Sequence, residues 1–246
     1  MNQPDKLYAK TRQIVNAFQF DENVARVFSD MIRRSVPGYP MMLDMLGVVA
    51  ETHVKDDTRC YDLGCSLGAS TLAIRQNLQA TGVDIVAVDN SSAMTTHCQE
   101  VIAQDTSQTP VDVICGDICD IDFTANSAPA SLVCLNLTLQ FIDQERRLPL
   151  LTRIADSLVD GGVLFLSEKL LFTDEFEQSH LTDLHHQFKK HQGYSDLEIA
   201  QKRSAIENVL VPETLEVHRK RLYDAGFRQV IVALQCFNFC TLIAYK

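Results

Sequence analysis

The 246-residue sequence predicts an α/β fold built on a mostly parallel sheet. From Arg59 onward, short apolar runs of strand length alternate with stretches of helical periodicity. That alternation is typical of parallel strands covered by helices on both faces. The last two strand-like runs, at residues 229–235 and 241–245, lie close together in the sequence. We therefore expect them to pair as an antiparallel hairpin at the sheet edge.

The first 50 residues are predicted to be helical and irregular. Apolar side chains recur at helical spacing from Val24 to Ile32. The segment VPGYP at residues 36–40 then breaks the pattern, because neither proline fits a helix interior. A second apolar stretch of helical spacing, at residues 41–49, leads into the alternating region.

Five strands are predicted in the alternating region, at residues 60–63, 83–88, 111–115, 132–137 and 163–167. Helices are predicted between them, at about residues 69–78, 91–104 and 143–158. A helical insertion at about residues 172–226 follows the fifth strand and precedes the hairpin. We expect all these elements, with the helical segment at about residues 1–50, to form a single domain over residues 1–246.

The chain is acidic, with 32 Asp and Glu against 22 Lys and Arg and a formal net charge of −10. Broad electrostatic binding of nucleic acid relies on clustered basic side chains, so we expect no direct binding of this kind. No apolar run is long enough to span a membrane, and the start of the chain lacks the charged and apolar regions of a signal peptide. These features favour a cytoplasmic protein that does not associate with membranes.

The eight cysteines are expected to be reduced thiols, because a long chain without a signal peptide does not need a disulfide framework. Two pairs have a spacing of four residues, Cys115 with Cys119 and Cys236 with Cys240. Both pairs lie in apolar, strand-like runs, and no CxxC motif occurs. We therefore expect no metal site.

A cluster of histidines and lysines lies in the helical insertion. It lacks metal-ligand spacing, and we expect to find it on a solvated helix surface. Its members are His185, His186, Lys189, Lys190 and His191.

Informative residues stand at the predicted carboxyl ends of four successive strands. The turn DLGCSLG at residues 62–68 closes the first strand, Asp89 and Asp117 end the second and third, and Asn136 ends the fourth. In parallel sheets, ligands bind at these ends, where the strand order reverses. The glycines allow close approach of a ligand to the backbone, and Asp89 can accept both hydroxyls of a ribose. Because Asp117 can receive an adenine amino group, the four features together predict a cofactor that contains adenosine.

Two other classes of protein share parts of this pattern. A dinucleotide-binding fold prefers G-x-G-x-x-G, but Ser66 occupies the position of the second glycine. The segment GCSLG also matches the nucleophile elbow G-x-S-x-G of α/β-hydrolases, and His218 could supply a late histidine. That elbow follows a central strand with several strands before it, whereas only helical sequence precedes residue 59 here. The context therefore disfavours a hydrolase, and Ser66 is expected to turn the backbone rather than to act as a nucleophile.

The D-x-G-x-x-x-G turn, with acidic residues at the ends of the next two strands, resembles the class I S-adenosylmethionine-dependent methyltransferases. The segment LVDGGVL at residues 158–164 is also typical of them. The resemblance covers about residues 50–170 and the final hairpin. It implies a Rossmann-like class I methyltransferase fold with a mostly parallel seven-stranded sheet, an antiparallel strand in the C-terminal hairpin and added helices. It implies the cofactor but not the reaction.

More specific segments lie outside this shared core, at residues 30–39, 61–69, 167–169, 193–199, 201–203 and 235–239. They resemble the carboxy-S-adenosyl-L-methionine synthases, and the similarity runs from about residue 20 to residue 246. This resemblance implies that S-adenosyl-L-methionine is a substrate whose methyl group is carboxylated. Prephenate would be the carboxyl donor, phenylpyruvate the by-product and carboxy-S-adenosyl-L-methionine the product. A second enzyme, a tRNA carboxymethyltransferase, would use that product to build 5-oxyacetyluridine at the tRNA wobble position.

The resemblance also implies a set of residues that bind S-adenosyl-L-methionine or its carboxylated product. Tyr39 would contact the ligand, and Gly64, Cys65 and Ser66 would line its amino-acid part. Asp89 with Asn90 would hold the ribose, Asp117 with Ile118 the adenine, and Asn136 would sit beside the sulfonium. Arg203 would hold the new carboxylate, for which its planar guanidinium is suited. No catalytic base is identified, since hydroxide leaving prephenate could take the methyl proton.

Family members are homodimers, and the sequence leaves open whether Arg203 acts in its own subunit or in its neighbour. Two other functions also stay open. One is an ordinary methyltransferase acting on tRNA or a small metabolite, which would not need Arg203. The other is a cofactor-binding protein without turnover.

Some positions depart from the family pattern. The connection at residues 122–129 is longer than expected, Leu170 and Leu171 follow Lys169, and Cys240 follows Phe239. None of these departures removes a proposed ligand-binding residue.

Overall fold

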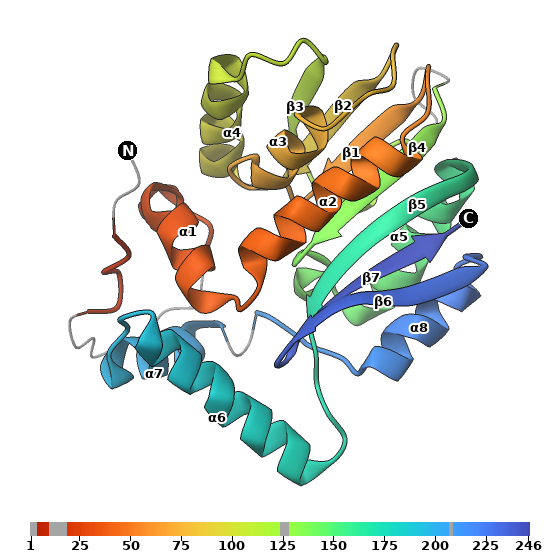
Figure 1. Ribbon diagram of the computed structural model, residues 1–246. Helices are drawn as coiled ribbons and strands as arrows, with labels where there is room; N and C mark the ends of the chain where they lie inside the picture. The colour runs from red at the N-terminus through yellow and green to blue at the C-terminus, as the bar shows by residue number, and fades with distance from the viewer. Residues whose placement is uncertain (1–3, 10–18, 124–127, 207–208) are drawn as a thin grey trace.

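A computed structural model describes residues 4–9, 19–123, 128–206 and 209–246 (Figure 1). In this part of the chain, seven strands form one sheet in the order β3-β2-β1-β4-β5-β7-β6. The strands are β1 (Arg59–Leu63), β2 (Asp84–Asp89), β3 (Val111–Cys115), β4 (Ala130–Asn136), β5 (Leu158–Lys169), β6 (Gln229–Cys236) and β7 (Phe239–Tyr245). The predicted α/β fold is therefore confirmed.

The described helices are α1 (Glu22–Ser35), α2 (Tyr39–His53), α3 (Ala69–Arg75), α4 (Ser92–Gln104), α5 (Gln144–Ser157), α6 (Glu175–His191), α7 (Asp196–Ile206) and α8 (Leu215–Asp224). Short polar side chains cap several of them. Asp21, Ser91, Asp174 and Thr214 each accept a hydrogen bond from a backbone N–H in the first turn of the helix that follows. Such caps satisfy donors that have no partner within the helix, so they fix where these helices begin.

The C-terminal hairpin is antiparallel, as predicted. Its second strand, β7, lies between β5 and β6 and runs antiparallel to both. The pairs formed among β1 to β5 are all parallel. The hairpin therefore inserts its last strand into the sheet and leaves β6 at the edge.

The fifth strand differs from the prediction at its start. It begins at Leu158, whereas the sequence places a helix up to this residue and a strand only from residue 163. The register between β4 and β5 shifts between Ala130 and Leu132, where Gly161 has a φ of +74°. The glycines thus form an irregularity within the extended segment, because the left-handed conformation that Gly161 adopts suits glycine.

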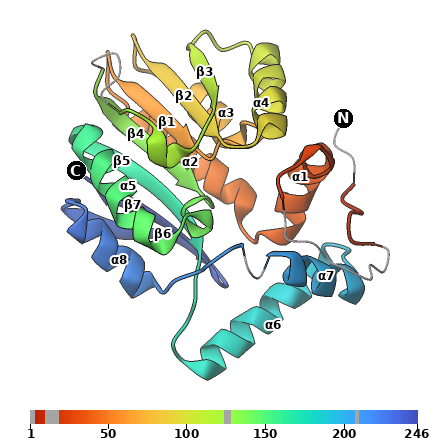
Figure 2. The ribbon, with the colours of Figure 1, turned by 180° about the vertical axis from the view of Figure 1, so that it is seen from behind.

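Two apolar cores lie on the two faces of the sheet. One contains Leu150 and Ile154 of α5 and Leu222 of α8. The other contains Leu46 and Val49 of α2. Figures 1 and 2 show α2 on one face and α5 and α8 on the other. This arrangement explains why the central strands β1 and β4 are buried along almost their whole length.

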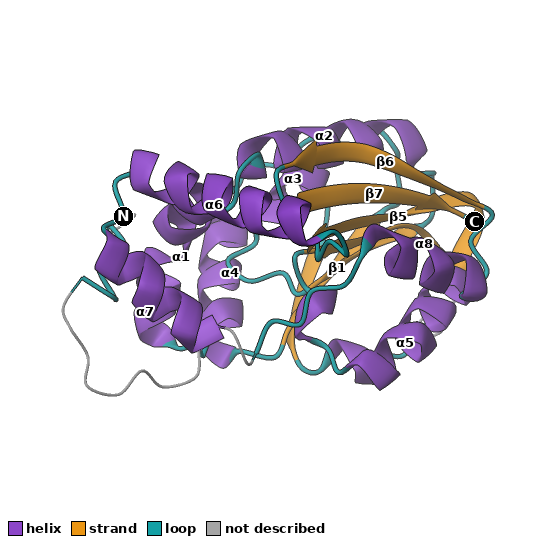
Figure 3. Ribbon diagram, turned by 90° about the horizontal axis from the view of Figure 1, so that it is seen from below, coloured by secondary structure: helices purple, strands orange, loops and turns teal. Residues whose placement is uncertain are grey.

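The helices α1, α6 and α7 lie together beyond one end of the sheet rather than over its faces (Figure 3). They belong to the two helical additions predicted at about residues 1–50 and 172–226. Parts of these additions, at residues 1–3, 10–18 and 207–208, lie outside the described residues, as do residues 124–127 of the long connection before β4. The assignment of one domain to residues 1–246 stays a prediction.

None of the described helices is long and apolar enough to cross a membrane. All eight cysteines lie in described segments, and each is a free thiol. Among the described residues, no group of three or more His, Cys, Asp and Glu side chains is placed to hold a metal ion.

Candidate active site

The turn after β1 is held in place by the neighbouring strand. The backbone N–H groups of Gly64 and Cys65 both donate to the carbonyl of Val88, at 2.7 and 3.0 Å. Gly64 has a φ of +84°, and a Cβ at this position would lie 2.3 Å from Oγ1 of Thr138. A side chain here would be strained in its backbone and would also collide with the loop after β4, so this glycine allows the two loops to approach each other.

Asp89 at the end of β2 links that turn to the next helix. It accepts hydrogen bonds from the backbone N–H groups of Ser66 at 3.0 Å and Ser91 at 2.9 Å. Burial raises the pKa of Asp89 above its usual value, although the two N–H groups oppose this change. Its neighbour Asn90 is exposed.

Asp117 follows β3 and is engaged by two donors. The backbone N–H of Cys119 donates to it at 2.8 Å and the guanidinium of Arg146 at 2.9 Å. Partial burial acts to raise the pKa of Asp117, but these donors outweigh it and hold the pKa below its usual range. The carboxylate is therefore ionised at neutral pH. Each of its oxygens has a second lone pair, so further hydrogen bonds can be accepted.

Asn136 ends β4, and among the described residues only one of the two polar atoms of its side-chain amide has a hydrogen-bond partner. Its Nδ2 donates to Oγ of Ser70 at 3.1 Å. Its buried Oδ1 has no hydrogen-bond partner in the described part of the chain. An unpaired buried acceptor is costly, which favours a ligand as its partner at this position.

Two non-glycine residues in these loops have a positive φ, namely Ser66 at 49° and Leu137 at 64°. The conformation of Leu137 is held by a backbone hydrogen bond, in which its N–H donates to the carbonyl of Ser167 at 2.8 Å. Backbone strain of this kind clusters at ligand-binding sites, and it persists where surrounding contacts hold it.

One cavity of about 640 Å³ lies against all these loops. The ten residues predicted to bind S-adenosyl-L-methionine or its product all line this cavity: Tyr39, Gly64, Cys65, Ser66, Asp89, Asn90, Asp117, Ile118, Asn136 and Arg203. The structure therefore brings together residues from six separate parts of the sequence. Whether each one binds the ligand stays a prediction.

The thiol of Cys65 does not lie free in this cavity. It is buried and hydrogen-bonded to the thiol of Cys98, and both this bond and burial raise its pKa far above the usual value. The backbone of Cys65 is thus the part of the residue that is suited to meet a ligand.

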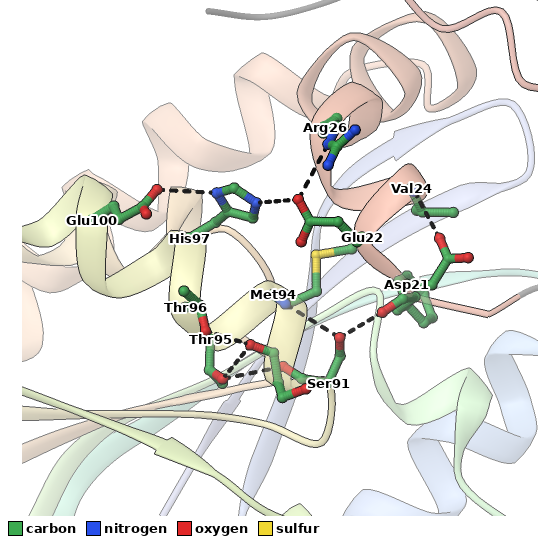
Figure 4. Close-up of polar contacts among 12 residues, drawn as sticks. Asp21, Glu22, Val24, Arg26, Ser91, Met94, Thr95, Thr96, His97 and Glu100 are labelled. Atoms are coloured by element: carbon green, nitrogen blue, oxygen red, sulfur yellow. Dashed lines mark hydrogen bonds and ion pairs between the residues drawn. The ribbon is translucent and has the colours of Figure 1, made fainter.

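The start of α1 and the residues just before it are bound to α4 by polar contacts (Figure 4). Ser91 donates to the carbonyl of Phe20 at 2.5 Å, and His97 contacts Glu22 at 3.4 Å. Phe20 lines the cavity and packs edge-on against Phe141, with ring centroids 5.5 Å apart. Phe141 also lines the cavity, so these contacts place two aromatic rings there, close to the loops that follow β2 and β4.

The cavity is also lined by basic side chains. Five cationic side chains line it: Arg33 on α1, Lys169 at the end of β5, Lys189 on α6, and Lys202 and Arg203 on α7. We call these five residues the basic cluster. In the described part of the chain, none of them forms an ion pair with a carboxylate. Unpaired cations in a partly closed cavity favour an anionic ligand.

Burial weakens the charge of the lysines in the basic cluster. It lowers the pKa of Lys189 to about 8, with Lys169 contributing in the same direction. It lowers the pKa of Lys202 to about 7, again with help from a neighbouring cation, Lys189. An anion bound among these groups would stabilise their protonated forms.

The prediction of a surface cluster on the helical insertion was wrong for three of its five members. His185 is buried, with its Nε2 2.7 Å from the carbonyl of Ser35, and burial lowers its pKa to about 2. His186 and Lys189 line the cavity. Lys190 and His191 are exposed, as expected. The prediction failed because α6 faces a cavity with these polar side chains. Such a helix has no apolar stripe in its sequence, so it resembles a solvent-exposed helix.

A mostly parallel sheet with an antiparallel β7, and acidic strand ends around a glycine turn, defines a class I S-adenosylmethionine-dependent methyltransferase fold. The family model described as "Methyltransferase domain" matches residues 61–162. The chain is also similar in structure to an O-methyltransferase family protein from Burkholderia thailandensis, with a TM-score of 0.64 and 17% identity over 92% of this chain and 60% of that one.

Two curated relatives show to which family within this fold class the chain belongs. The carboxy-S-adenosyl-L-methionine synthase of Pseudomonas syringae is 53% identical over 98% of both chains. That of Marinobacter nauticus is 52% identical over 98% of this chain and 95% of its own. The chain belongs to the carboxy-S-adenosyl-L-methionine synthase family.

Proposed function

We propose that the protein transfers a carboxyl group from prephenate to the methyl group of S-adenosyl-L-methionine. The products are carboxy-S-adenosyl-L-methionine and phenylpyruvate. The observation that carries this proposal is the basic cluster in the same cavity as the strand ends that suit adenosine. A plain methyl transfer places no carboxylate on the transferred carbon and does not need such a cluster.

The strand ends support the binding of S-adenosyl-L-methionine as a substrate. Asp89 and Asn90 hold the ribose, and Asp117 and Ile118 hold the adenine. The unpaired Oδ1 of Asn136 faces the sulfonium, since an amide oxygen favours a nearby positive charge.

The other proposed contacts lie at the amino-acid end of this substrate and at its reacting carbon. Gly64, Cys65 and Ser66 line the amino-acid part, and Tyr39 closes the pocket beside it. Arg203 binds the carboxylate that arrives on the methyl carbon. Arg203 lines the cavity that also contains the other proposed contacts.

The chemistry follows from the charge on sulfur, which makes the methyl protons acidic. Prephenate loses its ring carboxylate as CO2 and its ring hydroxyl as hydroxide, and the ring becomes aromatic. The hydroxide takes one methyl proton and becomes water, which leaves an ylide. The carbanion of the ylide then attacks CO2, forming the new C–C bond. The basic cluster binds the two carboxylates of prephenate. Because one of them is the carboxylate that leaves as CO2, this binding also places the released CO2 near the ylide.

We also propose that the protein works as a cytoplasmic homodimer and passes its product to a tRNA carboxymethyltransferase. The second enzyme would build 5-oxyacetyluridine at the wobble position. The acidic net charge of −10 supports a small-molecule step rather than direct action on tRNA.

The test is mass spectrometry of the ligand formed when purified protein is incubated with S-adenosyl-L-methionine and prephenate. We expect a species heavier than S-adenosyl-L-methionine by the mass of one CO2, together with phenylpyruvate. Appearance of only S-adenosyl-L-methionine or its demethylated product would instead indicate an ordinary methyltransferase.

Lys189 is expected to hold a carboxylate of prephenate. Replacing it with alanine should raise the KM for prephenate roughly tenfold, because a hydrogen bond to a charged group contributes about 1.5–3 kcal/mol. The affinity for S-adenosyl-L-methionine should stay unchanged. Steady-state kinetics and calorimetry measure the two quantities.

The pH dependence gives a second measure of the same residue. Because the pKa of Lys189 is about 8, its charge is present below that pH and is lost above it. The KM for prephenate should therefore rise as the pH passes 8, and Lys189→Arg should remove this part of the rise. The matched control is Lys190→Ala, since Lys190 is exposed and pairs with Asp196 at 2.5 Å. An equal effect of both alanine variants would contradict the assignment.

A further inference from the structure

The amino-terminal residues 4–9 form a short segment packed beside α1, next to the N-terminus in Figure 1. Asp5 in this segment is only 2% exposed. Its backbone N–H donates to Asp30 at 2.7 Å, and its carbonyl accepts from Arg34 at 3.1 Å. Both partners belong to α1, so the segment is fixed to that helix by polar contacts.

The same segment also contacts the region of α7. The hydroxyl of Tyr194 donates to Oδ2 of Asp5 at 2.5 Å, and Nε2 of Gln201 donates to the carbonyl of Tyr8 at 2.9 Å. Tyr8 is buried in an apolar cluster with Ala205 of α7. Residues 4–9 therefore bridge α1 and α7.

The Tyr194 ring connects this bridge to the basic cluster. The guanidinium of Arg34 lies 3.9 Å from the ring centroid, and Nζ of Lys202 lies 5.7 Å from it. Lys202 also donates to Oγ of Ser35 at 2.9 Å. Thus Asp5 orients Tyr194, and Tyr194 packs against the lysine that precedes Arg203. No residue of the segment itself lines the cavity.

Asp5 also affects the charge of Lys202. The groups that act on this ammonium are Lys189 on α6, Arg34 and Asp30 on α1, and Asp5. Burial and the two cations lower the pKa of Lys202, whereas the two carboxylates oppose them. Asp5 is thus one of two carboxylates that favour the charged form of this lysine.

We propose that residues 4–9 are a strap that positions α7, and that Asp5 is a positioning residue for the anion-binding side chains Lys202 and Arg203. The inference rests on the proposed function in one respect, which is that these side chains face the transferred carboxylate. The strap gives the amino terminus a role in the reaction although it lies outside the cavity.

The first test is Asp5→Ala in the full-length chain. We expect faster hydrogen–deuterium exchange in α7, with exchange in β1 and β2 unchanged. We expect the affinity for carboxy-S-adenosyl-L-methionine to fall roughly three- to tenfold, as for the loss of one hydrogen bond, while the affinity for S-adenosyl-L-methionine is kept. Lys6→Ala is the control, because Lys6 is an exposed residue of the same strap.

The second test separates the charge of Asp5 from its hydrogen bonds. Asp5→Asn removes a carboxylate that favours protonated Lys202, so the pKa of the lysine should fall further. The affinity for the carboxylated ligand should then decline at a lower pH than in the unsubstituted protein. A merely structural role of Asp5 would change the melting temperature but not this pH profile.

The outcomes distinguish this inference from the proposed function. If the unsubstituted protein makes the carboxylated product and Asp5→Ala matches Lys6→Ala in α7 exchange and ligand preference, the strap is refuted and the function stands. If the unsubstituted protein binds both ligands equally and forms no heavier product, the proposed function fails. In that case the exchange of α7 alone decides whether the strap positions this helix.

Discussion

Replacing Arg203 by leucine is expected to weaken binding of carboxy-S-adenosyl-L-methionine by roughly 10- to 150-fold and to leave the affinity for S-adenosyl-L-methionine nearly unchanged. On the proposed function, Arg203 makes paired, charge-assisted hydrogen bonds to a carboxylate that only the product carries, worth about 1.5–3 kcal/mol. The side chain lines the cavity and has no ion pair in the described segments. Its removal therefore leaves no protein carboxylate unpaired. Isothermal titration of both ligands measures the two affinities.

Two further variants define what this result would mean. Arg203→Lys keeps a positive charge but loses the planar fork, so its effect should be intermediate. Arg219→Leu is the control, because Arg219 is an exposed arginine on α8 away from the cavity. Equal weakening of both ligands by Arg203→Leu would rule out its assignment to the carboxylate.

The strand ends could be predicted from the sequence because their signal is local. The apolar runs before Asp89, Asp117 and Asn136 have strand length, and each polar residue stands at the end of its run or within two residues of it. Parallel strands carry their carboxyl ends to one edge of the sheet, so the alternating pattern also fixes that these residues meet. Gly64 could be predicted for the same reason, since a tight turn after a strand requires it.

The basic cluster could not be predicted in this way. A helix that faces a cavity does not show a regular apolar stripe, and the sequence of α6 therefore resembles a solvated surface. Only the packing of α6 and α7 beyond the end of the sheet turns Lys189 and Lys202 inward. Arg203 is predicted only through the family resemblance, because its position on a polar helix carries no local signal.

The strap was not predictable either. Asp5 is a single acidic residue in a polar terminus, and nothing in its neighbourhood has a helical or strand period. Its burial depends on Tyr194, which lies 189 positions later in the sequence. Contacts of such long range become visible only when the fold is known.

Replacing Asp89 by asparagine is expected to weaken both ligands by about the same factor, on the order of 100-fold. The carboxylate would lose charge-assisted hydrogen bonds to the ribose, which together contribute about 3 kcal/mol. The backbone N–H groups of Ser66 and Ser91 now donate to different oxygens of the carboxylate, at 3.0 and 2.9 Å. The amide keeps one oxygen as acceptor and would place its NH2 group against the other N–H. The turn that surrounds the amino-acid part of the ligand would shift as a result. Both S-adenosyl-L-methionine and its carboxylated form share the ribose, so neither should be favoured.

The ratio of the two affinities is therefore the informative quantity. The affinity for carboxy-S-adenosyl-L-methionine divided by that for S-adenosyl-L-methionine should fall strongly in Arg203→Leu, because only the first ligand carries the carboxylate. The same ratio should stay constant in Asp89→Asn, because both ligands carry the ribose. Asp112→Asn, an exposed change on the adjacent strand β3, should alter neither affinity. A selective loss of the carboxylated ligand in Asp89→Asn would mean that this residue lies at the reacting end of the cavity, and the proposed orientation of the substrate would have to be reversed.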